Sequence, residues 1–349
     1  MIGVHDVKKN ILDLTLEEIT DEIKSLGWPK FRSTQIFRWL YMGVKEFNDM
    51  TNLSKNDRCV LDDHFKITSL ELIKKQESRE DETIKCLFRL SDGELIESVL
   101  MKYKHGNSVC ISTQVGCAMG CSFCASGQEG LVRNLTTGEM VDQILKIGEL
   151  QSERISHVVL MGSGEPLQNL VNVVKLMKII NDKEGLNISL RHVTLSTCGL
   201  IPEIKKLATY KMPINLAISL HASNDETRRR IMPVARAYAI TDLVSVCDEY
   251  SRITGRRVTY EYSLIKGIND SILDMQNLAK LLKGKLCHVN LIPINPVEGS
   301  SYHTVNKSHS NDLSRVLLKA GIATTVRREL GSDIDAACGQ LKRRTLDDY

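Results

Sequence analysis

A regular alternation of strand-like and helix-like segments constrains the fold of this chain most strongly. Short β-branched runs fall at 109–115, 157–163, 192–198, 214–220, 258–264 and 288–294, with a last one at 322–327. Segments with helical spacing of apolar residues lie between most of them. Strands that alternate with helices predict a parallel sheet. No Gly-x-Gly-x-x-Gly turn follows a strand, so the pattern favours an α/β fold with a partial (β/α)6 barrel over a dinucleotide-binding sheet.

The first ninety-odd residues follow a different pattern. Thr15 and Glu18 form a capping box that opens a helix over 16–26, and further helical stretches are predicted at 33–43 and 56–65. Residues 82–103 alternate like a hairpin that turns at Asp92 and Gly93. The sequence therefore predicts two domains. These are a small helical accessory domain with a hairpin linker over 1–95, and a barrel with a C-terminal segment over 96–349.

Composition adds limits on location and partners. No run approaches the roughly 20 apolar residues that a membrane-spanning helix needs, and the N-terminus lacks the apolar core of a secretion signal. We therefore expect a cytoplasmic protein without membrane association. The net charge of +3, from 46 basic and 43 acidic residues, neither requires nor excludes a nucleic-acid partner.

Cysteines are unevenly spread along the chain. Of the ten, four fall within fifteen residues, and Cys117, Cys121 and Cys124 have the spacing C-x3-C-x2-C. Zinc sites usually need four protein ligands, often as paired C-x2-C units, and no second pair is present. Three thiolates on one loop suit a cubane iron–sulfur cluster with one open iron. The alternative is a structural zinc site that a distant histidine or cysteine completes.

A glycine-rich turn lies one βα unit beyond the cysteine loop. In the run MGSGEP, the backbone at Gly162 and Gly164 can approach a ligand closely, and Glu165 can accept a bond from an ammonium group. Such a turn is ordinary by itself. Together with a three-cysteine loop it indicates a site for the methionine end of S-adenosylmethionine (SAM), which can chelate an open iron.

The chain resembles the RlmN family, the radical SAM dual-specificity RNA methyltransferases that modify carbon 2 of adenine in 23S ribosomal RNA and in transfer RNA. The likeness covers nearly the whole chain. Its most specific segments are 110–127, 161–170, 195–202, 217–225, 288–296 and 333–341, together with 29–41 and 46–58 in the N-terminal part. The first six match the family's barrel, and the last two match its accessory domain.

The resemblance implies a role for each matching residue. Cys117, Cys121 and Cys124 would ligate one [4Fe-4S] cluster. The implied SAM contacts are Gly164, Glu165, Ser196, Ser219, Leu220, His221 and Asn295. Cys338 would carry the methyl group, Cys110 would be its resolving partner, and Glu97 would accept a proton. The remaining cysteines, which are Cys59, Cys86, Cys198, Cys247 and Cys287, are expected to be buried apolar residues, and the methionines of MGSGEP and IMP to serve packing.

The family chemistry explains why two cysteines beyond the cluster are needed. Carbon 2 of adenine is electrophilic and cannot attack a methyl cation donor. In the family, one SAM methylates Cys338, and a second yields a radical that takes hydrogen from the S-methyl group. The carbon radical adds to adenine. Loss of an electron and a proton, and attack of Cys110 on the Cys338 sulfur, then release the methylated base and leave a transient disulfide.

The sequence departs from the family pattern at two positions, and the resemblance also implies several partners. Ser163 stands where the family usually has methionine, and Cys198 where it has serine. Expected partners are 23S ribosomal RNA, transfer RNA and an electron donor such as flavodoxin or ferredoxin, and we expect a monomer. Candidate RNA contacts are Arg228 to Arg230, Arg256 and Arg257, Arg327 and Arg328, Lys342 to Arg344, and Lys30, Arg32 and Arg38.

Two alternative functions remain at this point. The first is the related methylase that acts on carbon 8 of the same ribosomal adenine, which shares the cluster, both catalytic cysteines and the barrel. The N-terminal segment favours carbon 2, because its WLY and MTNLSK runs resemble the housekeeping type. The second belongs to another class and is a zinc-stabilised RNA-binding protein without catalytic activity.

Overall fold

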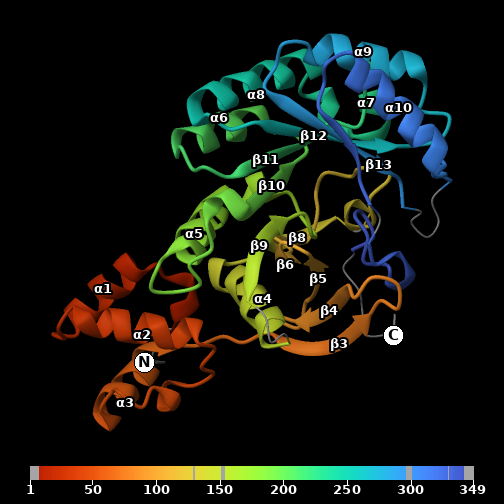
Figure 1. The fold of residues 1–349 in the computed structure, drawn as a ribbon. Helices are drawn as coiled ribbons and strands as arrows, with labels where there is room; N and C mark the ends of the chain where they lie inside the picture. Colours follow the sequence, from red (N-terminus) through yellow and green to blue (C-terminus); the bar gives the residue numbers. More distant parts are fainter. Residues whose placement is uncertain (1–7, 129, 151–153, 296–300, 329, 342–349) are drawn as a thin grey trace, which may run out of the picture.

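Ten strands form one curved central sheet (Figure 1), described by a computed structural model that covers residues 8–341 apart from 129, 151–153, 296–300 and 329. The order across the sheet is β14-β13-β12-β11-β10-β9-β6-β5-β4-β3. Neighbouring strands from β6 to β14 run parallel. Their bounds are β6 Gly106–Cys110, β9 Ile155–Leu160, β10 Val193–Thr197, β11 Asn215–Ser219, β12 Val258–Leu264, β13 Cys287–Pro293 and β14 Thr324–Val326. The predicted partial barrel is confirmed.

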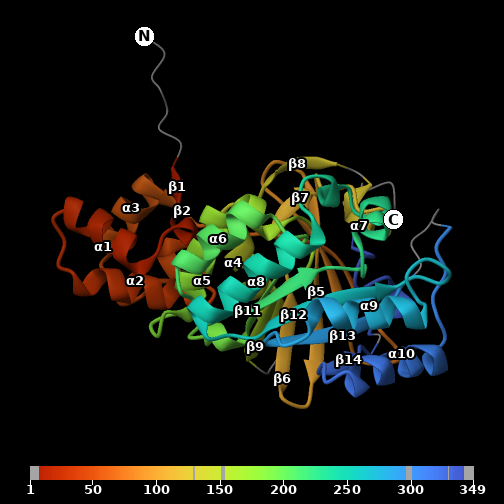
Figure 2. The same ribbon diagram turned by 90° about the horizontal axis from the view of Figure 1, so that it is seen from above.

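Helices cover the outer side of the parallel strands (Figures 1 and 2). They are α4 Thr137–Glu149, α5 Leu170–Asn181, α6 Ile201–Thr209, α8 Ile240–Thr254, α9 Ile272–Leu282 and α10 Lys307–Lys319. Strands enclosed on both faces must be apolar at successive positions, and Leu216, Ala217 and Ile218 of β11 are all buried. Each such aliphatic side chain contributes about 1.5–3 kcal/mol by leaving water. This core fixes where the strands end.

One further helix, α7 Asp225–Ile231, was not expected from the sequence. Its residues are mostly charged and have no apolar periodicity, so nothing in the pattern distinguishes the segment from a loop. The helix begins at Asn224, whose side chain accepts a hydrogen bond from the Thr227 backbone N–H. Arg228 on this helix is completely buried. The prediction that Arg228 belongs to an exposed RNA-binding cluster is therefore wrong.

Three antiparallel strands extend the sheet on the β6 side. They are β3 Glu71–Glu77, β4 Ile84–Arg89 and β5 Leu95–Tyr103. The predicted hairpin is confirmed, because β4 and β5 pair and the Gly93 N–H donates to the Leu90 carbonyl at 3.0 Å in the turn. The hairpin belongs to the central sheet. The proposed domain boundary at residue 95 stays a prediction.

The N-terminal helices surround a core of their own. They are α1 Leu16–Ser25, α2 Phe31–Tyr41 and α3 Lys55–His64, and the capping box of Thr15 and Glu18 is present. Buried side chains between them include Ile19, Ile23, Ile36, Phe37, Leu40 and Leu61. Asp13 attaches this part to the barrel by accepting a hydrogen bond from the Gly138 N–H at 2.6 Å. Among the described helices, none combines the length and apolarity needed to cross a membrane.

Candidate active site

A pocket opens where the parallel strands end, as a barrel of this kind predicts. It encloses about 930 Å³ including its open mouth, which is within the range of small-molecule sites. Five strands contribute to its wall. The lining includes Leu160 from β9, Ser196 and Thr197 from β10, Ser219 from β11, Glu261 and Ser263 from β12, and Ile292 from β13. Residues far apart in sequence therefore meet at one end of the sheet.

The cysteine loop connects the two strands of a small antiparallel ribbon, β7 Gln114–Gly116 and β8 Leu131–Asn134. Gly116 has φ +73°, and a Cβ there would lie 2.0 Å from the Gly130 carbonyl oxygen, so no other residue fits. Backbone hydrogen bonds then anchor the loop. The Ser122 N–H donates to the Ile231 carbonyl at 3.0 Å, and the Ala125 N–H to the Gly339 carbonyl at 2.8 Å. The second bond joins the cysteine loop to the segment that carries Cys338.

The three cysteines of this loop line the pocket together. Burial raises the pKa of the Cys117 thiol to about 11 and raises those of Cys121 and Cys124, so metal binding must displace their protons. Among the described residues, no three His, Cys, Asp or Glu side chains converge closely enough for a single metal ion. A cubane cluster does not need such convergence, because each thiolate binds a different iron. The donor set therefore fits a [4Fe-4S] cluster.

Glu165 is held rigidly beside this loop. Its Oε2 accepts a hydrogen bond from the Cys198 N–H at 2.8 Å, and its Oε1 accepts one from the Leu167 N–H at 3.0 Å. Burial raises the pKa of Glu165, and the two N–H donors oppose that effect. Gly164 has φ +108°, and a Cβ there would lie 2.6 Å from Gln114 Cβ. The turn therefore packs on the chain that leads into the cysteine loop.

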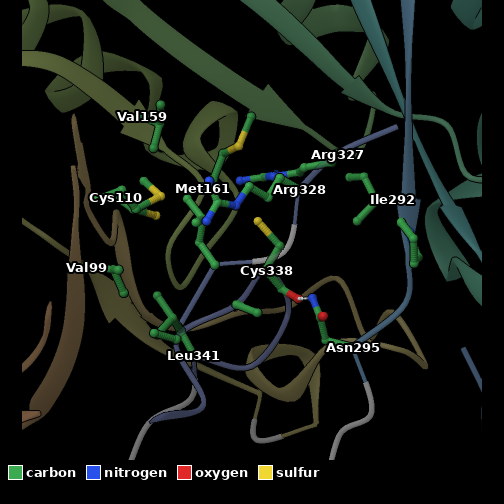
Figure 3. Close-up of a pocket in the computed structure, with 15 residues that line it drawn as sticks. Val99, Cys110, Val159, Met161, Ile292, Asn295, Arg327, Arg328, Cys338 and Leu341 are labelled. Atoms are coloured by element: carbon green, nitrogen blue, oxygen red, sulfur yellow. Dashed lines mark hydrogen bonds between the residues drawn. The ribbon is translucent and has the colours of Figure 1, made fainter. Parts of the chain in front are cut away.

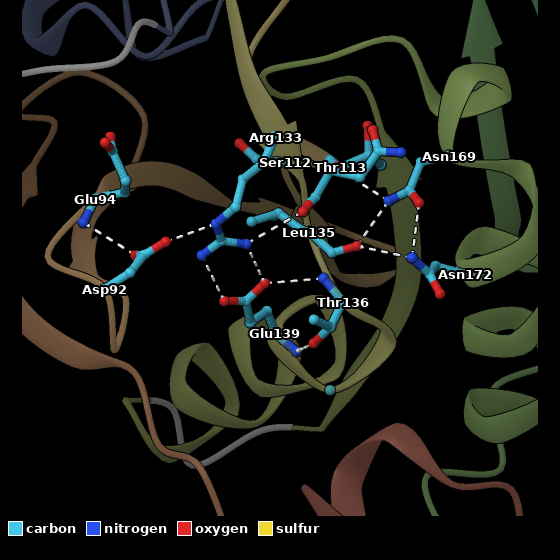
Figure 4. Close-up of polar contacts among 12 residues, drawn as sticks. Asp92, Glu94, Ser112, Thr113, Arg133, Leu135, Thr136, Glu139, Asn169 and Asn172 are labelled. Atoms are coloured by element: carbon cyan, nitrogen blue, oxygen red, sulfur yellow. Dashed lines mark hydrogen bonds and ion pairs between the residues drawn. The ribbon is translucent and has the colours of Figure 1, made fainter. Parts of the chain in front are cut away.

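A hydrogen-bond network fixes the segments on either side of the turn and the cysteine loop (Figure 4). Asn169 Nδ2 donates to the carbonyl oxygens of Thr113 and Leu135 at 2.9 and 2.8 Å. Arg133 donates to Glu139 at the start of α4 and to Asp92 in the β4–β5 turn. These contacts join segments from four parts of the chain around the strands that lead into and out of the cysteine loop.

His221 is buried at the end of β11 with φ +55°. Its Nδ1 accepts a hydrogen bond from the Ser263 N–H at 2.9 Å, which leaves the proton of the neutral ring on Nε2. Burial, with a smaller effect of Arg228, lowers the pKa of His221 to about 3. The imidazole is therefore neutral at physiological pH. It lies edge-on to Phe123 of the cysteine loop, with ring centroids 4.8 Å apart.

A second pocket adjoins the first and contains both predicted catalytic cysteines (Figure 3). Cys110 at the end of β6 and Cys338 point into it, and burial raises the pKa of the Cys110 thiol to about 12. Asn295 Nδ2 donates to the Cys338 carbonyl at 3.2 Å. Residues that line both pockets are Met161, Ile292, Asn295, Arg327 and Cys338. Cys338 thus lies where the two pockets meet.

Arg327 follows β14 and is electrostatically coupled to both cysteines. The thiol of Cys338 is the main cause that raises the pKa of Arg327, with Glu261 and Cys110 adding to it. Arg327 therefore places a positive charge near the sulfur atoms of both cysteines.

Glu97 does not line either pocket. Side chains two residues apart in a strand share a face, so Glu97 lies on the same face of β5 as Val99. Val99 lines the second pocket. The Glu97 carboxylate is 3.4 Å from Lys85 Nζ of β4, and the exposed fractions of the two side chains are 1% and 2%. Lys85 Nζ also donates to the Asp335 carbonyl at 3.3 Å. The ion pair therefore reaches the segment that carries Cys338.

The structure brings together most of the residues that the sequence singled out. The main pocket is lined by Cys117, Cys121, Cys124, Gly164, Glu165, Ser196, Ser219, His221, Asn295 and Cys338. Leu220 is apart from them, because its side chain is buried in the core. Sequence reasoning missed Glu261 and Ser263, which have no motif of their own, and named Arg327 only as a candidate RNA contact. Only the position of these residues in or just after a strand could have suggested them.

Two sets of expected packing residues need correction. Cys59 is exposed on α3, because it faces outward on a helix that covers its core with only one side. Cys198 and Met161 line the main pocket in addition to packing.

Of the basic clusters, Lys342 to Arg344 lie outside the described residues. Arg256 and Arg257 precede β12 and so lie at the opposite end of the strand from the pocket.

Comparisons with known proteins agree with this site. The Radical SAM superfamily model matches residues 111–279, and the Ribosomal RNA large subunit methyltransferase N-terminal domain model matches 9–67. The "Probable dual-specificity RNA methyltransferase RlmN" of Alkaliphilus oremlandii is 57% identical over 97% of this chain and 99% of its own length. The protein of the same name from Clostridium novyi is 52% identical over 97% of this chain and 99% of its own length.

The solved structure of a radical SAM methyltransferase from Sphaerobacter thermophilus is also similar. It is 43% identical, with a TM-score of 0.91, and the match covers 95% of this chain and 99% of that one.

Proposed function

Because this chain belongs to the RlmN family of radical SAM RNA methyltransferases, we propose that it methylates carbon 2 of an adenine in 23S ribosomal RNA and in transfer RNA. Radical SAM enzymes use a [4Fe-4S] cluster and SAM, and the cluster supplies the electron that cleaves SAM reductively. In this proposal Cys117, Cys121 and Cys124 hold the cluster. We further propose a cytoplasmic monomer that receives electrons from a flavodoxin or ferredoxin.

SAM is held in this proposal by groups that are already fixed before it binds. Two backbone donors orient the carboxylate of Glu165. In this orientation it accepts hydrogen bonds from the SAM amino group. His221 offers an Nε2–H donor, since its Nδ1 is already occupied by Ser263. Ser196, Ser219 and Asn295 supply further polar contacts along the wall. Preorganised partners of this kind bind without an ordering cost at the moment of reaction.

Cys338 takes the methyl group first. Its thiolate attacks the methyl carbon of one SAM, a C–S bond forms, and S-adenosylhomocysteine leaves. Arg327 lines the same two pockets as Cys338, so its positive charge lies near the sulfur that reacts. A second SAM, cleaved reductively, would supply the radical that takes a hydrogen atom from the S-methyl group, and the carbon radical on Cys338 then adds to carbon 2 of adenine. The adduct then loses one electron, for which the cluster would be the acceptor, and the proton of carbon 2, for which Glu97 is the proposed acceptor.

Cys110 completes the reaction. The Cys110 thiol gives up its proton as its sulfur attacks the Cys338 sulfur, the bond between that sulfur and the methylene carbon breaks, and the carbon takes up a proton to become the methyl group. A disulfide between Cys110 and Cys338 remains and must be reduced before the next turnover. The observation that carries the proposal is the position of Cys338, which lines both the pocket of the cysteine loop and the pocket of Cys110.

The two cysteine roles predict different failures. A Cys338→Ala variant cannot accept the methyl group, so it should give no methylated RNA and no covalent RNA complex. A Cys110→Ala variant should add to RNA but fail to release it, so a protein–RNA adduct should accumulate and survive denaturing electrophoresis. Cys247→Ala is the matched control, because Cys247 is buried in the core of the barrel. The covalent mechanism would be contradicted if the Cys338→Ala variant methylated RNA or formed a covalent protein–RNA adduct.

A further inference from the structure

Arg228 on α7 is a buried cation whose hydrogen bonds, among the described residues, go only to backbone carbonyls. Its side chain has no exposed surface. Its Nε donates to the Leu220 carbonyl at 3.2 Å, and its Nη2 donates to those of Cys198 at 2.7 Å and Ser219 at 3.4 Å. Its Nη1 is buried and has no hydrogen-bond partner among the described residues. One side of the guanidinium is thus fixed, and the other still has N–H groups to donate.

No carboxylate in the described part of the chain forms an ion pair with Arg228. A buried charge is costly unless an opposite charge or a set of hydrogen bonds compensates it. Burial lowers the pKa of Arg228, and the thiols of Cys198 and Cys121 oppose this more strongly than the carboxylate of Asp225. Arg228 is thus a buried cation that lacks a carboxylate partner in the described part of the chain and interacts electrostatically with the Cys121 thiol of the cysteine loop.

Helix α7 packs directly on the cysteine loop. Its last residue, Ile231, accepts hydrogen bonds through its carbonyl from the Ser122 N–H and from Ser122 Oγ, at 3.0 and 3.3 Å. Ile231 and Met232 share one apolar cluster with Cys121 and its neighbours Met119 and Phe123. Arg228 lies one helical turn earlier. Its other anchor, the Cys198 carbonyl, belongs to a residue that lines the same pocket.

We propose that the positive charge of Arg228 balances the negative charge of the iron–sulfur cluster. Through this charge and the N–H groups of Nη1, Arg228 sets the reduction potential of the cluster. This inference rests on the proposed ligation of a cluster by Cys117, Cys121 and Cys124. A cluster with three thiolates is an anion, and one added electron makes it more negative. A fixed, buried cation stabilises the reduced form more than the oxidised form, so it raises the potential. Arg228 thereby favours the reduced state that SAM cleavage requires.

The test is an anaerobic redox titration of the reconstituted full-length protein, followed by EPR. Arg228→Gln removes the charge, and we expect the equilibrium between oxidised and reduced cluster to shift at least tenfold toward the oxidised form, which is about 59 mV for one electron. Arg228→Lys keeps the charge but not the carbonyl bonds, and should recover most of the shift. Arg230→Gln removes the same charge from an exposed position of α7 and should titrate like the wild type. A wild-type potential in Arg228→Gln would overturn the proposal.

A second measurement covers the case in which Arg228→Gln does not fold. In wild-type protein labelled with ¹⁵N-arginine, pulsed EPR of the reduced cluster should detect a weakly coupled nitrogen that is lost in Arg228→Lys. No such coupling, or one that persists in Arg228→Lys, would overturn the role of Nη1. Failure of the cluster proposal itself looks different. In that case the reconstituted wild type binds no iron and sulfide, and no potential can be measured for any variant.

Discussion

Glu165 gives the pocket a pH dependence. Its carboxylate is fully buried, and burial raises its pKa. In the proposed site, the positively charged amino group of SAM binds the ionised carboxylate. Affinity for SAM is therefore complete above the raised pKa and is lost as the pH falls through it. His221 does not contribute to the pH dependence of SAM binding, because its pKa of about 3 keeps it neutral in the pH range in which Glu165 titrates.

Titration calorimetry with SAM on the reconstituted protein, from neutral to mildly acidic pH, measures this effect. The wild-type affinity should fall with the pH. Glu165→Gln should bind about tenfold or more weakly at neutral pH, because a hydrogen bond to a charged group is worth roughly 1.5–3 kcal/mol, and its affinity should not depend on pH. A pH profile shared by the two proteins would contradict the role of Glu165.

Individual site residues were predictable to different degrees. The spacing of Cys117, Cys121 and Cys124 identifies the loop from chemistry alone, because few other sites need three thiolates so close together. Cys338 has no such signal and was singled out only through the family resemblance. Arg228 was misjudged, because three consecutive arginines indicate a surface and the sequence does not say which of them faces inward. Its burial depends on the packing of α7.

The ion pair between Lys85 and Glu97 links β4, β5 and the C-terminal segment. Both side chains are almost completely buried. Removing one partner of a buried pair leaves the other charge in a dry environment, which costs about 3–5 kcal/mol. We expect Lys85→Met to lower the free energy of unfolding by about this amount, and the double variant Lys85→Met/Glu97→Gln to recover part of the loss.

Urea denaturation followed by circular dichroism checks this prediction. Lys75→Met is the matched control, since Lys75 forms an ion pair with Glu77 on the exposed neighbouring strand β3. Surface pairs contribute about 0–1 kcal/mol, so the control should change little. If Lys85→Met were no more destabilising than Lys75→Met, the buried ion pair would not contribute to the stability of β4, β5 and the C-terminal segment.

Most helices and strands were predictable because each has a clear period. Apolar spacing identified α4 to α6 and α8 to α10, and β-branched runs identified the parallel strands. Periodicity does not reveal which strands pair across the sheet. The hairpin of β4 and β5 was therefore expected to be a linker, whereas its pairing with β6 makes it part of the central sheet. That placement depends on contacts between distant segments.

The N-terminal helices carry an exposed surface suited to RNA. Phe31 on α2 is 57% exposed, and the Arg32 guanidinium lies 5.3 Å from the centre of its ring. Lys30 is exposed beside them. An exposed ring with a cation above it can stack on an unpaired base while its neighbours bind phosphate. Arg257, by contrast, is exposed at the far end of β12, away from the pocket.

These surfaces predict different effects on RNA binding. Phe31→Ala should weaken binding of a 23S ribosomal RNA fragment by about 1–3 kcal/mol, the worth of one base stacked on an aromatic ring. Lys30→Gln should weaken it modestly and reduce its dependence on salt. Arg257→Gln is the control and should bind like the wild type. Filter binding at several salt concentrations measures all three. Equal losses in Phe31→Ala and Arg257→Gln would exclude the α2 surface as the RNA site.

The position of the methyl group on adenine tests the whole account most directly. The full-length protein, reconstituted anaerobically and supplied with SAM and a reductant, is incubated with 23S ribosomal RNA or transfer RNA from cells that lack the gene. The RNA is then digested and its nucleosides identified by mass spectrometry. We predict 2-methyladenosine, and none with Cys338→Ala. The appearance of 8-methyladenosine instead, or of 2-methyladenosine with Cys338→Ala, would contradict the account.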